Sequence, residues 1–206
     1  MLTVSLLSFN LLVVVEQRMI TYEVNRAELE LVEKKLGDMK SKAPQVFKNA
    51  VNKTARQARK RIAQSAKGAY TVKQVGFNSH MKIKNASTGN LTASVDADGK
   101  PLTLVRFKNR AGRPKKGGAA AAADIVNGGL KQLVSSQGGK AFKRNGLVMQ
   151  REGKDRLPVK VFHSNSVPKM VEKVYQGERG MAGALKEPIQ SDLRKNLEAE
   201  IKKIVG

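Results

Sequence analysis

The sequence predicts an α+β fold, with helices near the N-terminus, a central antiparallel sheet of about five strands that carries a long basic loop, and a C-terminal helix. Two observations support this prediction. Apolar residues recur at helical spacing in residues 23–67 and again after residue 187. Between these stretches lie short apolar runs of strand length, separated by breaks rich in glycine, asparagine and serine. Helices that flank a group of strands, and do not alternate with them, are typical of an α+β fold.

Three helices are expected from apolar spacing and end signals. Residues 23–40 place apolar side chains on one face, and Gly37 weakens the end of this helix. Residues 41–67 form a longer helix, whose apolar face consists of Phe47, Val51, Ala55, Ala58 and Ile62. The last helix begins near Pro188 and carries a stripe formed by Ile189, Leu193, Leu197, Ile201 and Ile204. We expect this stripe to pack on the chain's own core, with a neighbouring subunit as the alternative.

The middle of the chain is typical of strands joined by turns. Short strands are expected at residues 81–86, 91–96, 102–107, 141–143, 147–151 and 157–162. Asn145 and Gly146 form a dipeptide that favours a tight hairpin, because both residues tolerate a positive φ. Ser166 and Pro168 then start a helix that runs through Tyr175, since serine caps helices and proline suits the first turn.

The chain of 206 residues is long enough to bury a sizeable core, and we interpret residues 19–206 as a single domain. The apolar run within residues 1–18 is shorter than the roughly 20 residues that span a bilayer. No basic residue precedes that run, as one would in a secretory signal. We therefore interpret residues 1–18 as an upstream extension, with Met19 as the natural start, and a membrane anchor is the alternative.

The formal net charge of +22 and the isoelectric point near 10.4 lie far outside the range of ordinary globular proteins. The excess is confined to the middle of the chain, since residues 41–175 hold 28 basic and 6 acidic residues. Residues 1–40 hold 5 basic and 6 acidic residues, and residues 176–206 hold 6 and 5. A polyanion such as DNA is therefore the first partner that the composition indicates.

The segment 107–123 is the strongest local feature. It combines five basic residues with no acidic residue and ends in five alanines, so we expect a mobile loop that lacks an apolar face. Gly112, Arg113 and Pro114 partly match a minor-groove motif, but Ala111 replaces its first arginine, which favours phosphate contact without base reading. A solubilising loop is the alternative. The candidate DNA contacts in this segment are Lys108, Arg110, Arg113, Lys115 and Lys116.

A second set of candidate contacts lies on the helix expected at residues 41–67. Lys53, Arg56 and Lys60 follow one another at helical spacing and lie away from the apolar face. A cationic stripe of this kind can face the phosphates of a nucleic acid. A solvated basic face is the alternative interpretation.

Little in the sequence favours enzyme chemistry. The chain has no cysteine, which excludes disulfides, thiolate zinc sites and a cysteine nucleophile. His80 and His163 each adjoin a serine, but adjacent residues of a strand point to opposite faces, so neither forms a Ser-His pair. Asp96 and Asp98 precede Gly99 in a pattern typical of a turn, and no further acidic ligands follow at metal-binding spacing. We expect no catalytic residue, no metal site and no cofactor.

A run of residues between positions 148 and 170 has a recognisable pattern. It reads V-x-Q-R-x-G-K-x-R-x-P-V from Val148 to Val159, and Val167 and Pro168 then start a helix. This run resembles the core of the minor tail protein Z family of lambda-type tailed bacteriophages, in which V-x-Q-R-x-x-G-K-x-R-x-P-[IV] leads to a V-P helix start. The turn after Arg151 is one residue shorter here. A looser likeness extends to residues 50–56 and to the basic loop.

The resemblance implies a structural protein of a phage or prophage tail. Such a protein acts in tail completion at the head-proximal end of the tail, in head–tail joining, together with the tail terminator and other neck proteins. The resemblance also implies homo-oligomeric rings about the DNA channel, in which a positive surface would meet packaged DNA without sequence preference. The expected location is the virion, with the host cytoplasm during assembly. A free cytoplasmic DNA-binding protein without sequence specificity is the alternative.

Overall fold

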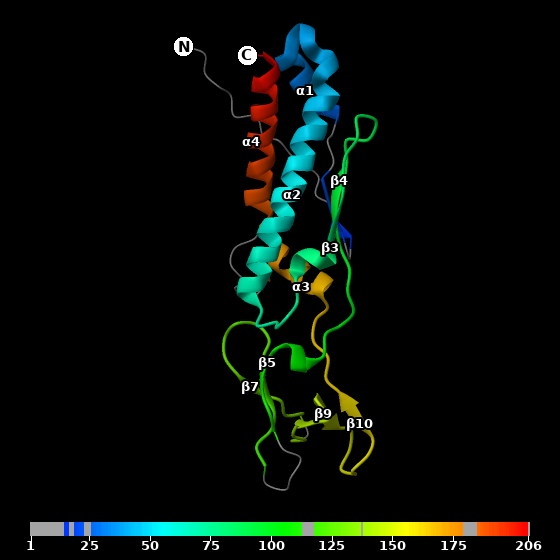
Figure 1. Cartoon of the computed structure of the whole chain (residues 1–206), viewed down its shortest axis with the longest axis vertical. Helices are drawn as coiled ribbons and strands as arrows, with labels where there is room; N and C mark the ends of the chain where they lie inside the picture. Colours follow the sequence, from blue (N-terminus) through cyan, green and yellow to red (C-terminus); the bar gives the residue numbers. More distant parts are fainter. Residues whose placement is uncertain are drawn as a thin grey trace. The chain divides into compact units, whose positions relative to one another are not determined.

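The structure is a computed structural model, and it describes residues 15–16, 19–22, 26–112, 118–136, 138–178 and 185–205. The chain divides into two compact units. The first unit comprises residues 1–61, 81–97 and 184–206, and the second comprises residues 62–80 and 98–183. The boundary at residues 61 and 62 falls inside the long helix α2 (Ala43–Ala69), so that this helix contributes residues to both units (Figure 1).

The first unit contains α1 (Arg26–Leu36), the N-terminal part of α2 and α4 (Lys186–Val205). The predicted first helix is shorter than expected. It ends at Leu36 because Gly37 adopts a φ of 54°, and the short 3-10 helix η1 (Gly37–Lys42) leads into α2. Helix α2 itself agrees closely with the prediction, although it continues through Gly68 to Ala69.

Helices α2 and α4 lie side by side in the first unit (Figure 1). Every member of the predicted apolar face of α2 is buried, as are Ile189, Leu193 and Leu197 of α4. Asn196 of α4 donates hydrogen bonds to Thr54 Oγ1 at 2.9 Å and to Gln57 Oε1 at 2.8 Å. These three residues of the α4 stripe therefore pack within their own chain as expected, with a helix as a partner, whereas Ile201 and Ile204 are half-buried.

A four-stranded antiparallel sheet completes the first unit. Its strand order is β1 (Val15–Glu16), β2 (Met19–Tyr22), β4 (Ala93–Ala97) and β3 (Met81–Lys84). Strand β4 is central, with Ile20 on one side of Val95 and Ile83 on the other. The interpretation of residues 1–18 stays a prediction, since most of them lie outside the described residues. No helix within the described ranges is long and apolar enough to cross a membrane.

The second unit contains two three-stranded antiparallel sheets and α3 (Val167–Gln176). One sheet has the order β10 (Val159–Val161), β9 (Leu147–Arg151) and β8 (Phe142–Arg144). The expected hairpin between β8 and β9 is confirmed, with a φ of 49° at Asn145 and 72° at Gly146. Helix α3 also begins as predicted, because Ser166 Oγ accepts a hydrogen bond from the backbone nitrogen of Lys169.

The prediction of one central five-stranded sheet is wrong, since the described strands form three small sheets. Alternating polarity identifies a strand but not its partners, so separate hairpins resemble one sheet in sequence. Residues 102–107 are also not a strand. They form the 3-10 helix η3 (Leu104–Arg106), because Leu104 and Phe107 are three residues apart and a helical turn buries both.

The expected loop at 107–123 is partly ordered structure. Its ends are the paired strands β5 (Lys108–Arg110) and β6 (Ala122–Asp124), and β7 (Lys131–Gln132) extends this sheet. The alanines from 120 to 123 are buried, because their small side chains allow backbones to approach closely. Gly112 is close to the same backbone, and a Cβ there would lie 2.3 Å from Ala121 N. Residues 113–117 lie outside the described residues, so mobility at the centre of the loop stays a prediction.

Candidate nucleic-acid interface

The structure describes five of the eight predicted DNA contacts. Lys53, Arg56 and Lys60 lie on α2 in the first unit, and Lys108 and Arg110 lie on β5 in the second unit. All five are exposed. The remaining three, Arg113, Lys115 and Lys116, lie outside the described residues. The two described groups belong to different units, so each is considered alone.

The α2 group is a continuous cationic stripe on a well-packed helix. Its three side chains are exposed, while the opposite face of α2 is buried through Val51, Ala55 and Ala58. A rigid helix holds the positive charges about one turn apart, which suits contact with successive phosphates. We call Lys53, Arg56 and Lys60 the α2 stripe.

Other basic residues of α2 bind within the first unit. Arg61 Nη2 lies 2.7 Å from Asp192 Oδ2 of α4, and Arg59 Nη1 donates to the Met81 carbonyl oxygen at 3.5 Å. The α2 stripe, by contrast, makes no ion pair or side-chain hydrogen bond within the described part of the chain. The helix therefore uses some of its cations to hold neighbouring elements and leaves three directed to solvent.

One acidic residue influences the end of the stripe. Glu200 of α4 forms an ion pair with Lys203 at 2.5 Å and accepts a hydrogen bond from Asn49 at 3.1 Å. The Lys203 hydrogen bond lowers the pKa of Glu200 against the opposing effect of burial, and Lys53 adds a smaller lowering effect. The negative charge of Glu200 therefore partly compensates Lys53, so we expect Lys53 to contribute least of the three residues to phosphate binding.

The β5 group contains one paired and one unpaired cation. Lys108 and Arg110 alternate with Asn109, so they share one face of the strand. Lys108 Nζ lies 4.0 Å from Oδ2 of Asp124, a carboxylate that is only 2% exposed. Arg110 makes no ion pair among the residues that the structure describes. Of the two cations, Arg110 is therefore more available than Lys108 for contact with a phosphate.

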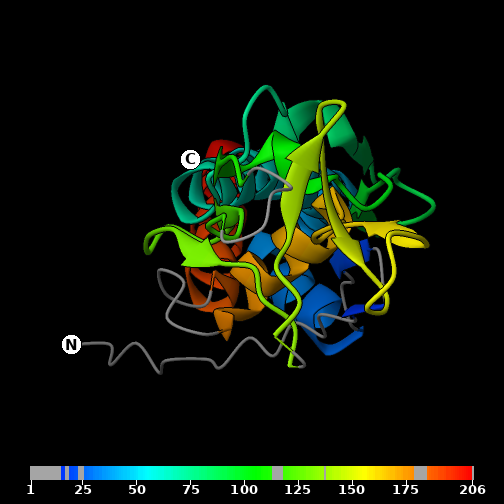
Figure 2. The ribbon, with the colours of Figure 1, turned by 90° about the horizontal axis from the view of Figure 1, so that it is seen from below.

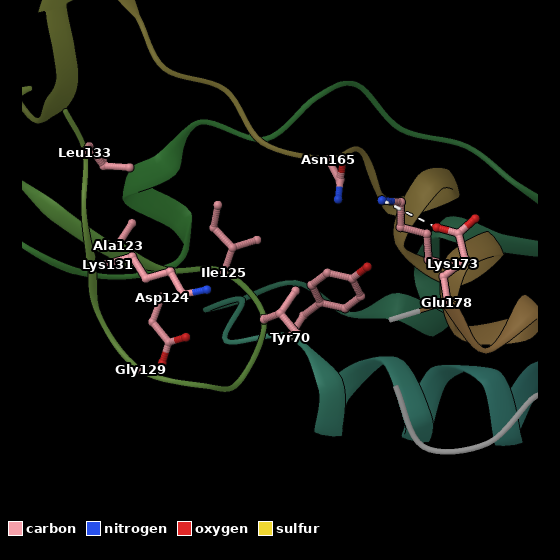
Figure 3. Close-up of a pocket in the computed structure, with 11 residues that line it drawn as sticks. Tyr70, Ala123, Asp124, Ile125, Gly129, Lys131, Leu133, Asn165, Lys173 and Glu178 are labelled. Atoms are coloured by element: carbon pink, nitrogen blue, oxygen red, sulfur yellow. Dashed lines mark ion pairs between the residues drawn. The ribbon is translucent and has the colours of Figure 1, made fainter. Parts of the chain in front are cut away.

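A pocket of about 470 Å³ lies beside this sheet in the second unit (Figure 3). The Tyr70 hydroxyl points into it, toward Asn165 and the ion pair that joins Lys173 to Glu178 at 3.7 Å. Burial, with a smaller effect of Glu178, raises the pKa of Tyr70 to about 12, so the phenol stays protonated at neutral pH. The pocket thus holds a neutral phenol and the Lys173–Glu178 ion pair, together with Lys131 and Asp124.

Two buried polar atoms of this pocket are not matched inside the described structure. Asp124 Oδ1 lacks a hydrogen-bond partner among the described residues, and the Tyr70 hydroxyl meets none in good hydrogen-bond geometry, although the nearby Asn165 side chain slightly lowers the pKa of Tyr70. Sequence reasoning missed both groups, because a lone tyrosine after a helix and a lone aspartate after five alanines carry no motif. The described residues also contain no cluster of three or more side chains that could hold a metal ion.

The aspartates considered as cation ligands have other contacts. Asp96 Oδ2 lies 2.7 Å from Lys84 Nζ across the β3–β4 pair. Asp98 lies 3.7 Å from His80 Nδ1, and its backbone nitrogen donates to the His80 carbonyl oxygen.

Comparison of the chain with protein-family models, curated proteins and solved structures finds no significant match.

Proposed function

We propose that this chain is a structural protein of a phage or prophage tail that acts in tail completion at the head-proximal end of the tail. In this role it joins other tail and neck proteins, such as the tail terminator, and forms a homo-oligomeric ring. Its positive surface contacts packaged DNA without reading sequence. The tail role rests on the resemblance of residues 148–168 to the minor tail protein Z family.

DNA contact rests on one structural observation, the exposed and unpaired α2 stripe. A net charge of +22 provides long-range attraction, and a ring would repeat the stripe once in each subunit. Contacts of this kind involve phosphates and depend on salt, but they carry no sequence information. The observation supports a protein that holds or guides DNA without selecting a site.

The second candidate is a free cytoplasmic DNA-binding protein without sequence specificity. The same stripe supports it, because phosphate contact does not require assembly. The two candidates differ in their protein partners. A tail-completion protein assembles with products of neighbouring tail genes, whereas a free DNA-binding protein needs only duplex.

Co-purification from cells that express the chain with the products of its flanking genes tests the proposal. We expect the tagged chain to bring down a tail protein, and the complex to persist after nuclease treatment. A chain that purifies alone, yet binds two unrelated duplexes with equal affinity, would instead support the free DNA-binding protein. Equal affinity for the two duplexes is expected under either candidate, so the protein partner decides between them.

A further inference from the structure

A second basic surface lies in the second unit, on the sheet formed by β8, β9 and β10. The ribbon of β10 is yellow in Figures 1 and 2. A groove of about 350 Å³ opens on one face of this sheet. Three arginines line it, namely Arg144, Arg151 and Arg156. The remaining lining is mostly apolar and includes Phe142, Met149, Leu157 and Val159. We call this feature the arginine groove.

Strand register explains why apolar and basic residues meet there. Phe142 lies opposite Met149, and Val159 lies opposite Arg151. Directly opposed residues point to the same side of an antiparallel pair. The apolar residues that form the floor of the groove therefore share one face of the sheet with Arg151, which lies at its rim. The other face carries Val148 and Gln150, which are buried. Phe142 on this face is buried and Met149 and Val159 are half-buried, so the described residues of the second unit leave the face of the arginine groove only partly covered.

The charges of the groove are not compensated within the described structure. Arg144, Arg151 and Arg156 are exposed, and none makes an ion pair with a described residue. None of the described residues that line the groove is acidic. Glu152 and Asp155 occupy the loop between β9 and β10, where both are exposed and neither forms a described ion pair. A ligand with negative charges would therefore complement the rim.

Leu157 is the strongest sign that the ligand also has apolar groups. Its side chain is 69% exposed, more than any other large hydrophobic residue in the described part of the chain. It lies next to Arg156 and lines the groove with the partly buried Met149 and Val159. Methionine and arginine are enriched in protein interfaces, and arginine there often contributes a large share of the affinity. The exposed Leu157 adds apolar surface beside them.

We propose that the arginine groove binds an acidic segment of a partner protein that carries apolar side chains between its carboxylates. Each arginine can donate two parallel hydrogen bonds to one carboxylate, while Leu157 and Met149 contact the intervening apolar groups. Duplex DNA matches the rim but not the floor, since the phosphate backbone presents no apolar side chains. A second copy of this chain complements the three arginines poorly, because it carries a net charge of +22, so the contacts of the proposed ring would lie at other surfaces. The proposal goes beyond the proposed function and needs neither DNA contact nor a tail.

Fluorescence anisotropy of the full chain with three labelled probes tests the proposal. The first probe is a peptide that alternates glutamate with leucine and phenylalanine, the second replaces its apolar residues with serine, and the third is a duplex DNA. We expect the first peptide to bind at least about tenfold more tightly than the second, although both carry the same charge. Equal affinity for the two peptides would overturn the proposal, because charge alone would then explain binding.

Two pairs of variants locate the binding site. Arg151→Ala with Arg156→Ala should weaken binding of the first peptide at least about tenfold, whereas Lys154→Ala with Lys160→Ala should change it less than about twofold. The control removes the same charge from the same hairpin, at exposed residues that do not line the groove. Leu157→Ser should weaken the first peptide and leave duplex binding unchanged, with the exposed Val134→Ser as its control. Equal losses in the variant and control pairs, or a loss of duplex binding in Leu157→Ser, would overturn the proposal.

Discussion

The α2 stripe gives the most quantitative prediction about DNA contact. We expect the triple variant Lys53→Ala, Arg56→Ala and Lys60→Ala to weaken binding to duplex DNA and to make it less dependent on salt. The three side chains are exposed and form no ion pair or side-chain hydrogen bond with a described residue, so the fold should be retained. Alanine also has the highest helix propensity, which preserves α2 itself.

The size of the effect follows from counterion release. Each phosphate contact adds about 0.9 to the negative slope of log K against log salt on B-DNA, so three contacts account for about 2.7. The ratio of wild-type to variant affinity should then be about 40-fold larger at 50 mM than at 200 mM salt. Lys53 lies in the field of Glu200, so its share should be the smallest. These figures are therefore upper values for the stripe.

Fluorescence anisotropy with a labelled duplex over a salt series measures both slopes. The matched control is Lys34→Ala with Lys35→Ala and Lys40→Ala, which removes the same charge from exposed positions outside α2. A control that lowers the slope as much as the triple variant would show that the overall charge, and not the stripe, determines binding. An unchanged slope in the triple variant would refute the assignment of the stripe outright.

Three further predictions concern stability. Asn196→Ala removes a buried hydrogen bond to Thr54 and a partly buried one to Gln57, and it should lower the free energy of unfolding in urea by about 1–3 kcal/mol. A loss below about 0.5 kcal/mol would contradict the importance of these two bonds. The lowered pKa of Glu200 stabilises the folded state at pH values above 4.5, the ordinary pKa of this group. The stabilisation is lost as pH falls through the pKa of Glu200 in the folded state, so Glu200→Gln should flatten the fall of the melting temperature in acid. The raised pKa of Tyr70 stabilises the folded state fully below pH 10.0, and this stabilisation is lost as pH rises toward about 12. Tyr70→Phe should therefore abolish the loss of stability at alkaline pH. A loss of stability that persists unchanged in the variant would implicate other groups.

Local signals in the sequence predicted individual elements well. Asn145 and Gly146 form the β8–β9 hairpin and Ser166 caps α3, because each signal depends on only a few neighbouring residues. The end of α1 was predicted less well, since Gly37 ends the helix at Leu36, before the predicted end at residue 40. The apolar face of α2 was equally clear, since a 27-residue helix repeats its pattern many times. The exposure of the α2 stripe follows from the same periodicity.

Long-range pairing could not be predicted in the same way. Nothing in residues 119–123 indicates that Ala122 and Ala123 pair with β5 or that the alanines from 120 to 123 lie buried, because alanine carries neither strand propensity nor apolar bulk. The strands also separate into three sheets through contacts between distant segments. Register was the missing information for the arginine groove as well. Arg151 joins the apolar residues only once β9 is paired with β10.

Light scattering tests the central claim, that the chain is an assembling tail protein whose positive surface contacts DNA. The measurement uses protein that begins at Met19, over a salt series, with and without a short duplex. We predict a discrete multiple of the protomer mass that persists at high salt and binds the duplex as an assembled particle. A monomer that binds duplex more tightly as salt falls, and never assembles, would contradict the claim and favour the free DNA-binding protein.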